Sequence, residues 1–324
     1  MFPQKLRKGD VVRVVAPARS LAVISPELRM IAEQRFKEIG LEITYGKHVE
    51  EKDEFASSSI KSRVEDIHES FADSKVRMVI SAIGGFNSHQ LLPYLDFALI
   101  RKNPKIFCGY SDITALENGI YARTGLVTYS SPAFSTFGMQ KGFDYTMTYF
   151  MKCLFSDALI KIIPGLEWSD DSWYKDQENR VFVRNSGMYV IQEGEAEGTI
   201  IGGNMGTLRL LQGTPYMPSL RDSILFIEDD EEDKSQHIDR SITGLSQHPE
   251  FRQVKAIVIG RFQKASEMTK EKLTKIIKSN PALKHIPVIA DVDFGHTSPM
   301  ITFPVGGRAK LTVRNGIKLE ILSH

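Results

Sequence analysis

The chain has 324 residues, more than a single hydrophobic core usually organises, so its length predicts two domains or one domain with a large appendage. Its composition, 42% hydrophobic and 25% charged, is typical of a soluble globular protein, and a net charge of +1 predicts neither a nucleic-acid partner nor a membrane surface. No segment has the roughly 18 uninterrupted apolar residues of a membrane span and no apolar leader opens the chain, so we expect a cytoplasmic protein.

Strand and helix patterns alternate over the first part of the chain. β-Branched runs predict strands, and apolar residues recurring on one face predict helices, the first with Ser25 as N-cap and Pro26 at its first position. This alternation is typical of an α/β fold with a doubly wound parallel sheet. The predicted elements are, in chain order, a strand at 10–17, a helix at 26–39, a helix at 59–72, a strand at 76–83, a strand at 105–108, a helix to about residue 123 and a strand at 126–130.

The rest of the chain divides into an irregular stretch and a second module. Residues 141–197 are rich in Asp, Glu, Asn and Trp and show weak periodicity, so we expect a connection that also makes an excursion over a site. Strand patterns resume at residue 198. We therefore predict an N-terminal domain over 1–140, a connection and substrate loop over 141–197, and a C-terminal α/β domain with a mixed sheet over 198–324.

Polar or glycine residues follow four of the predicted strands, at the edge where a parallel sheet binds its ligands. They are Gly84 and Gly85, Ser111, Glu228 and His296. A histidine, whose pKa lies near neutrality, can take the proton of a serine hydroxyl, and a carboxylate on its other ring nitrogen holds the required tautomer. Ser111 as nucleophile, His296 as base and Glu228 as the orienting acid are therefore candidates for a catalytic triad.

The backbone amides of Gly85 and Asp112 are the predicted oxyanion donors. Asp112 stands at the N-terminus of a predicted helix, where N–H groups point outward. Gly85 lacks a side chain, so its backbone can approach a ligand closely. Two such donors are what a developing oxyanion requires.

Each of these signals also has a structural interpretation. A serine before a helix is most often an N-cap, and GYSDI lacks the second glycine of the G-x-S-x-G elbow, so the local pattern alone favours a cap at Ser111. His296 is compatible with an ordinary loop histidine, and Glu228 begins an acidic run that is usually a solvated face. The segment IIGGNMGTL opens a helix as a phosphate loop does, but matches neither nucleotide-binding fingerprint, and its alternative is a tight turn.

Metal chemistry is the other alternative. Asp291, Asp293 and His296 offer oxygen and nitrogen ligands, but no second histidine lies at helical ligand spacing. Cys108 and Cys153 are too few for a disulfide framework and lack the paired spacing of a zinc site, so both are predicted to be buried. We therefore expect neither a metal nor an organic cofactor.

Six segments, taken in order, carry a family resemblance: LRKGDVVRVVAPA, the GG turn before LLPYLDF, GYSDITAL, GGNMGTL, ILFIED and FGHTSPMITFPVGGRAKL. Over nearly the whole chain they resemble the LD-carboxypeptidase family of serine peptidases. The resemblance implies a flavodoxin-like N-terminal domain, a C-terminal domain of mixed sheet, and a homodimer. It also implies a Ser111, Glu228 and His296 triad split between the domains, with oxyanion donors at Gly85 and Asp112.

Within the family the sequence resembles the microcin C self-immunity branch. Its glycine turn reads IGGFNSHQ, where murein-recycling carboxypeptidases typically have R-G-G-Y-G. That branch cleaves the amide-type bond between an aminoacyl or peptidyl group and a nucleotide, which implies such a small-molecule substrate. The indole ring of a tryptophan can stack on the base of such a nucleotide. The expected substrate-binding residues are Gly84, Asn87, Ser88, Trp168, Trp173 and Asn204.

Two other functions stay open at this point. An LD-carboxypeptidase would release D-alanine from murein tetrapeptides in cell-wall recycling, although Ile83 replaces the turn arginine of that branch. A non-catalytic nucleotide-binding module would bind adenylates without turnover. The predicted triad favours a hydrolase over the binding module.

Overall fold

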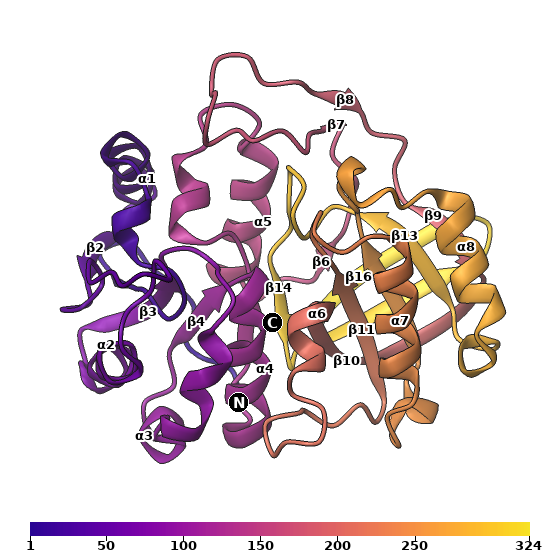
Figure 1. The fold of residues 1–324 in the computed structure, drawn as a ribbon, viewed down its shortest axis with the longest axis horizontal. Coiled ribbons are helices and arrows are strands. Elements are labelled where there is room, and N and C mark those ends of the chain that lie inside the picture. The colour runs from indigo at the N-terminus through magenta and orange to yellow at the C-terminus, as the bar shows by residue number, and fades with distance from the viewer.

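The computed structural model describes residues 1–324 as two α/β halves packed side by side (Figure 1). The N-terminal half carries a six-stranded sheet and the C-terminal half an eight-stranded sheet. A two-stranded ribbon, made of β7 (Glu167–Trp168) and β8 (Val183–Arg184), arches over the top of the view. None of the helices combines the length and apolar character that crossing a membrane requires.

Sheet A of the N-terminal half has the strand order β14-β5-β4-β3-β1-β2. Strands β1 to β5 run parallel in the flavodoxin-like order, while β14 runs antiparallel to β5, which confirms the predicted doubly wound class. The strands are β1 (Val11–Val15), β2 (Glu42–Tyr45), β3 (Val76–Ser81), β4 (Ile106–Gly109), β5 (Thr128–Ser130) and β14 (Phe303–Val305).

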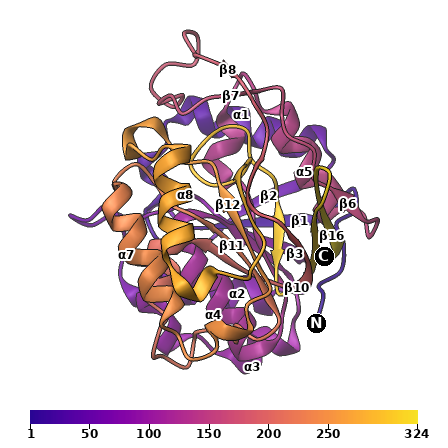
Figure 2. The ribbon, with the colours of Figure 1, turned by 90° about the vertical axis from the view of Figure 1, so that its right-hand side faces the viewer.

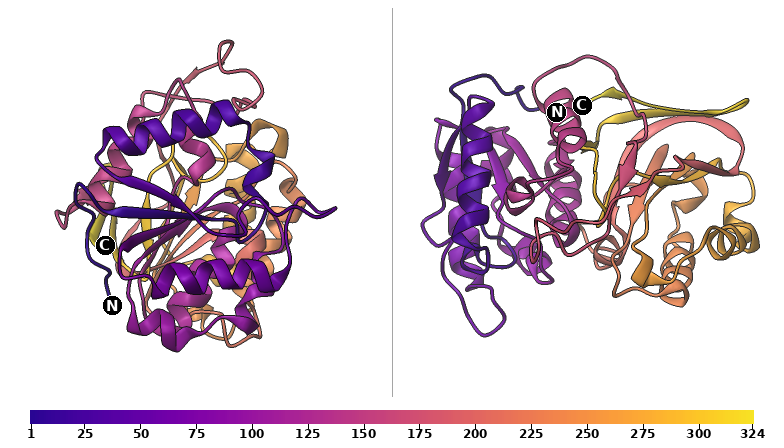
Figure 3. Two further views of the ribbon diagram at one scale, coloured as in Figure 1. Left: turned by 90° about the vertical axis from the view of Figure 1, so that its left-hand side faces the viewer. Right: turned by 90° about the horizontal axis from the view of Figure 1, so that it is seen from above.

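Helices cover both faces of sheet A, as the left view of Figure 3 shows for α1 and α2. Side chains of alternating direction feed two separate cores, Val14 toward α1 and Val15 toward α2. Ser25 caps α1 as predicted, because its Oγ accepts the N–H of Leu28. The helices of this half are α1 (Pro26–Glu38), α2 (Ile60–Ala72), α3 (Phe97–Lys102), α4 (Thr114–Thr124) and α5 (Asp144–Leu154).

Sheet B is mixed, as predicted. Strands β10 to β13 run parallel, and the other four pair antiparallel in the order β6-β16-β15-β10-β11-β12-β13-β9. In Figure 2, α7 and α8 cover the face toward the viewer. The elements are β6 (Ile160–Lys161), β9 (Tyr189–Gln192), β10 (Gly194–Asn204), α6 (Met205–Arg209), β11 (Ser223–Glu228), α7 (Ser235–Ser246), β12 (Ala256–Gly260), α8 (Lys270–Ser279), β13 (Val288–Val292), β15 (Arg308–Val313) and β16 (Ile317–Ser323).

The stretch between the two halves is partly built into both. It contains α5, packed on the core of sheet A, and β6 and β9, the two edge strands of sheet B. The domain division at residues 140 and 197 therefore stays a proposal. Both cysteines are free and buried, as predicted. Short 3₁₀ helices lie at Leu21–Val23, Ser88–Tyr94, Ser111–Ile113, Phe134–Gly138, Phe251–Gln253, Lys264–Ser266 and Pro281–Leu283.

Candidate active site

Ser111 lies in a strained corner just beyond β4. Tyr110 is extended, and Ser111 opens a short 3₁₀ helix with a φ of 63°, in the left-handed region that residues other than glycine rarely adopt. Such a conformation costs on the order of 1–3 kcal/mol and is characteristic of functional sites. Neither this helix nor α4 is capped by the Ser111 hydroxyl, so the capping interpretation is wrong for this serine.

Ser111, His296 and Glu228 meet between the two halves. His296 Nδ1 lies 2.7 Å from Oε2 of Glu228, and its Nε2 lies 3.0 Å from Oγ of Ser111. Glu228 is the last residue of β11 and is only 3% exposed, while His296 follows β13. In the neutral histidine, Nδ1 donates to the carboxylate and Nε2 accepts from the hydroxyl. The geometry can support nucleophilic attack by the serine.

The acidic surroundings of His296 favour its protonated form. Burial, the largest influence, lowers the His296 pKa, but the charge and hydrogen bond of Glu228 and the charges of Asp230 and Asp229 raise it to about 9. Burial and then the charge of Glu228 raise the pKa of Asp229 to about 8. Because these groups are neighbours, their proton equilibria are coupled.

The glycine turn after β3 lies against the serine. A Cβ on Gly84 would come within 3.0 Å of the Cβ of Ser111 and 3.2 Å of its Oγ, so glycine permits this close approach. The N–H of Gly85 donates no hydrogen bond within the chain, and Asp112 follows Ser111 in the first turn of the 3₁₀ helix. The two predicted oxyanion donors thus adjoin Ser111 from separate loops, and their function as donors is a proposal.

Ser88 connects the glycine turn to the serine corner, and Asn87 connects it to α2. Ser88 is fully buried, its N–H donating to Oδ2 of Asp112 over 2.8 Å and its hydroxyl to the Asp112 carbonyl over 2.7 Å. Asn87 accepts a 3.0 Å hydrogen bond at Oδ1 from the buried Arg63. Both residues therefore position the loops around the serine, and their contact with substrate stays a prediction. Arg63 was missed, since an arginine in a helix usually indicates a surface position.

Asn204 and the two glycines before it join β10 to α4. The Asn204 N–H donates to Thr114 Oγ1 over 2.9 Å, and Asn118 Nδ2 donates to the Gly202 carbonyl over 2.8 Å. Gly203 has a φ of +123°, and a Cβ there would come within 2.4 Å of Thr114 Oγ1. The GGN segment is therefore a close contact between the halves. Thr114 and Asn118 carry no local signal of this role, because their partners lie 90 and 84 positions further along the chain.

The Asn204 side chain is engaged inside the protein. Its Oδ1 accepts the N–H of Thr207 over 2.9 Å, and its Nδ2 donates to Oδ1 of Asp229 over 3.0 Å. Asn204 is also the register partner of Glu228 in the adjacent strand. It orders the strand ends that carry Glu228, and its contact with substrate stays a prediction.

The two tryptophans have different surroundings. The ring of Trp168 in β7 lies 5.0 Å from the guanidinium carbon of Arg261 and 4.8 Å from Lys264 Nζ. Trp173 is partly buried against the large hydrophobic core and meets Tyr174 edge to face. Both tryptophans are partly exposed, but Trp168 lies between cations whereas Trp173 packs against the hydrophobic core.

Hydrogen bonds tie the β7–β8 ribbon to the loop that carries His296. Ser169 and Ser298 exchange two backbone hydrogen bonds of 2.7 Å each, and Ser298 is the second residue after His296. In the loop that joins β7 to β8, the buried side chain of Arg180 pairs with Asp171 over 2.8 Å. The tryptophan of β7 is thus anchored beside the triad loop.

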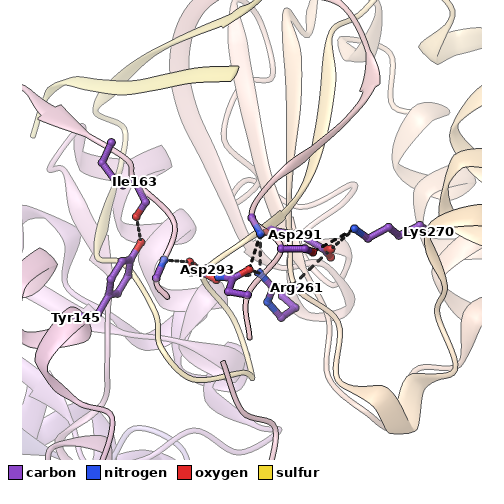
Figure 4. A network of polar contacts seen from close by, with 10 residues as sticks. Tyr145, Ile163, Arg261, Lys270, Asp291 and Asp293 are labelled. Carbon is purple, nitrogen blue, oxygen red and sulfur yellow. Dashed lines mark hydrogen bonds and ion pairs between the residues drawn. The ribbon is translucent and has the colours of Figure 1, made fainter. Parts of the chain in front are cut away.

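The acidic residues of the metal alternative are paired with cations (Figure 4). Asp293 lies 3.1 Å from Nη2 of Arg261 and accepts the N–H of Gly165 over 2.8 Å. Asp291 lies 3.6 Å from Arg261 and 3.7 Å from Lys270. No group of three or more His, Cys, Asp or Glu side chains is placed to hold a metal ion. Asp291 and Asp293 therefore belong to an ion-pair network that anchors the connection between the two halves.

Known proteins match the chain in sequence. Residues 12–131 match the family model of the LD-carboxypeptidase N-terminal domain, and residues 197–311 match that of the C-terminal domain. The chain is 51% identical to YocD of Bacillus subtilis (strain 168), which is provisionally named a carboxypeptidase, over 98% of this chain and 97% of that protein. It is 35% identical to the microcin C7 self-immunity protein MccF of Escherichia coli, over 96% and 92% of the two chains.

Solved structures share the fold. An MccF-like protein from Bacillus anthracis str. Ames superimposes with a TM-score of 0.99 at 53% identity, covering 100% of both chains. MccF in complex with aspartyl sulfamoyl adenosine gives a TM-score of 0.90 at 30% identity, covering 100% of this chain and 99% of that one. Matched in both domains and over nearly its full length, the chain belongs to the LD-carboxypeptidase family and is a serine peptidase-type hydrolase.

Proposed function

We propose that the protein hydrolyses the amide-type bond between an aminoacyl or peptidyl group and a nucleotide, using Ser111, His296 and Glu228. The observation that carries the proposal is the pair of contacts made by His296, 2.7 Å to Glu228 and 3.0 Å to Ser111. Similarity supports the nucleotide half of the substrate, because structures of MccF contain aspartyl sulfamoyl adenosine and glutamyl sulfamoyl guanosine.

In the proposed reaction His296 Nε2 takes the hydroxyl proton as Ser111 Oγ attacks the acyl carbon. Glu228 accepts the Nδ1–H bond and stabilises the imidazolium that forms. The amides of Gly85 and Asp112 hold the oxyanion. His296 then protonates the departing nitrogen, and a water molecule activated by the same imidazole releases the acyl group from the serine as a carboxylic acid.

We assign the base of the nucleotide to Trp168. Stacking a base on an aromatic ring contributes about 1–3 kcal/mol in nucleic-acid binders and requires only an accessible π-face. Trp168 supports this assignment better than Trp173, because its ribbon is tied to Ser298 beside the triad loop while Trp173 packs on the core.

The test is mass spectrometry of an aminoacyl sulfamoyl adenosine incubated with wild type and with Ser111→Ala. The wild type is expected to release the amino acid and sulfamoyl adenosine, and the variant to be slower by about 10³-fold or more. Equal rates would exclude Ser111 as the nucleophile. A murein tetrapeptide run in parallel separates the LD-carboxypeptidase alternative, because preferred release of D-alanine would replace the nucleotide proposal.

The proposal includes a homodimer, which rests on the family resemblance alone. Light scattering coupled to size-exclusion chromatography measures the mass directly. A mass near the 36.5 kDa of one chain would exclude the dimer.

A further inference from the structure

Arg19, in the loop after β1, is anchored to the glycine turn beside Ser111. Its backbone N–H and its Nε donate to the Gly84 carbonyl over 3.4 and 3.2 Å. A Cβ on Gly85 would come within 3.2 Å of Arg19 Cγ. Since Gly84 itself packs against Ser111, the guanidinium is held one loop away from the nucleophile.

The outer part of this guanidinium has no partner within the protein. Only Nε of the Arg19 side chain makes a hydrogen bond, and no carboxylate lies within ion-pair distance of its Nη1 or Nη2. The side chain is partly exposed. The cations beside Trp168 differ, because Arg261 is paired with Asp293 and Lys264 with Asp170. A guanidinium with one nitrogen anchored and two free is prearranged to bind an oxyanion in a bidentate manner.

The charge of Arg19 also reaches the serine corner. Burial raises the pKa of Tyr110, and the Arg19 charge partly offsets that rise. On the opposite side of the triad, Asp229 and Asp230 act on His296 with negative charge. The site therefore has carboxylates that act on the histidine and, beside the glycine turn, the Arg19 guanidinium with two free nitrogens.

We propose that Arg19 binds an anionic group that the substrate carries on the leaving-group side of the scissile bond. This inference rests on the proposed function. An aminoacyl group has an ammonium next to its carbonyl, which Arg19 would repel and the carboxylates that act on the histidine would attract. The leaving group carries the opposite charge: a sulfamoyl or phosphoryl linker in a nucleotide conjugate, or a carboxylate in a released amino acid. All three anions present oxygen atoms to a guanidinium in the same way.

Two aryl esters of one amino acid test the inference without a natural substrate. One has an uncharged phenol as leaving group, and the other has a sulfonate beside the ester oxygen. Arg19→Gln is expected to lower kcat/KM for the sulfonated ester by about 10- to 100-fold, mainly through KM, because the anion is bound equally before and during reaction. The uncharged ester should lose much less than the sulfonated one, because for it the variant removes only the Nε bond to the glycine turn and no contact with an anion.

Two further variants complete the comparison. Arg19→Lys keeps the charge without the bidentate fork and should retain part of the preference for the sulfonated ester. Arg314→Gln makes the same charge change at an exposed turn and should alter neither ester. Thermal unfolding verifies that each variant is folded. An equal loss on both esters, or no loss on either, would overturn the role of Arg19.

Two further substrates, a nucleotide conjugate and a peptide, form the two arms of an assay that separates this inference from the proposed function. Wild type and Arg19→Gln are assayed with an aminoacyl sulfamoyl adenosine and with a peptide ending in D-alanine, and the arm that loses more in the variant identifies the anion that Arg19 meets. If the wild type leaves the nucleotide conjugate intact but cleaves the esters, the proposed substrate is wrong, while the ester comparison still decides on Arg19. If the wild type cleaves neither the nucleotide conjugate nor the esters, both the proposed function and the role of Arg19 are overturned.

Discussion

Glu228→Gln tests the electrostatic link between the triad acid and His296. The substitution preserves shape but removes the negative charge that, with a 2.7 Å hydrogen bond, overrides burial and raises the His296 pKa to about 9. Without that charge the effect of burial prevails, and the pKa is expected to fall to the ordinary value of 6.5 or below. A change of this size corresponds to about 3 kcal/mol of imidazolium stabilisation.

The assay is kcat/KM for an aminoacyl ester over roughly pH 5 to 10. Because the base must be neutral, kcat/KM of the wild type should rise with pH along a limb whose midpoint lies near the His296 pKa of about 9. Asp229, with a pKa of about 8, titrates in the same range. In Glu228→Gln the limb should move down by about 2 pH units while the plateau falls by roughly 10²- to 10⁴-fold. Asp230→Asn, a weaker contributor, should shift the limb only slightly. A limb at the same pH in wild type and Glu228→Gln would refute the reasoning.

The same link predicts a pH-dependent loss of stability. A folded pKa of about 9 against an ordinary 6.5 stabilises the folded protein fully below pH 6.5, and this contribution disappears as pH rises through 9. Glu228→Gln should therefore be more destabilised relative to wild type at about pH 6 than at about pH 10 in urea unfolding. A difference that does not change with pH would contradict the raised pKa.

Five other substitutions, at four positions, test the contact between the two halves and the surroundings of the two tryptophans. Thr114→Val removes the acceptor of the Asn204 N–H, so it should lower the free energy of unfolding in urea by about 1–3 kcal/mol and also lower kcat. Thr114→Ser keeps the hydroxyl and should retain the wild-type stability and kcat. An unchanged kcat in Thr114→Val would exclude a positioning role. Gly203→Ala should destabilise by about 2 kcal/mol or more, since a Cβ would meet Thr114; wild-type unfolding would contradict the packing. Trp168→Ala should raise KM for nucleotide conjugates but not for simple esters, and Trp173→Ala should mainly lower Tm. If both variants changed the preference for nucleotide conjugates equally, the proposed stacking of the base on Trp168 would be wrong.

The three residues of the proposed triad could be selected from the sequence because they stand at or beyond the ends of strands with clear patterns. A parallel sheet binds its ligands at the carboxyl ends of its strands, so the end of β4 in sheet A and the end of β11 in sheet B could each be identified as a candidate edge. What the pattern could not supply was the left-handed backbone at Ser111 or the two contacts of His296. These depend on how the two halves pack, which leaves no periodic signal.

The residues that hold the halves together were not identified for the same reason. GGN looked like a turn or a phosphate loop, and only the fold shows that Gly203 lies against Thr114. The strands β6 and β9 lie in the stretch interpreted as a connection, because two and four residues among many polar ones are too few to show a strand period. They exist as strands because β16 and β13 offer open edges to pair with.

Strand β14 determines when sheet A can be completed during synthesis of the chain. It completes the N-terminal sheet, with Phe303 paired to Ser130, yet it is translated long after β5. At about 5–20 residues per second, the edge of β5 stays open on the ribosome for roughly ten to thirty seconds, a period in which an unpaired strand can capture another chain. His296 emerges from the ribosome only shortly before β14. The pairing that closes the edge of β5 and the histidine of the proposed triad are therefore synthesised within a few residues of each other.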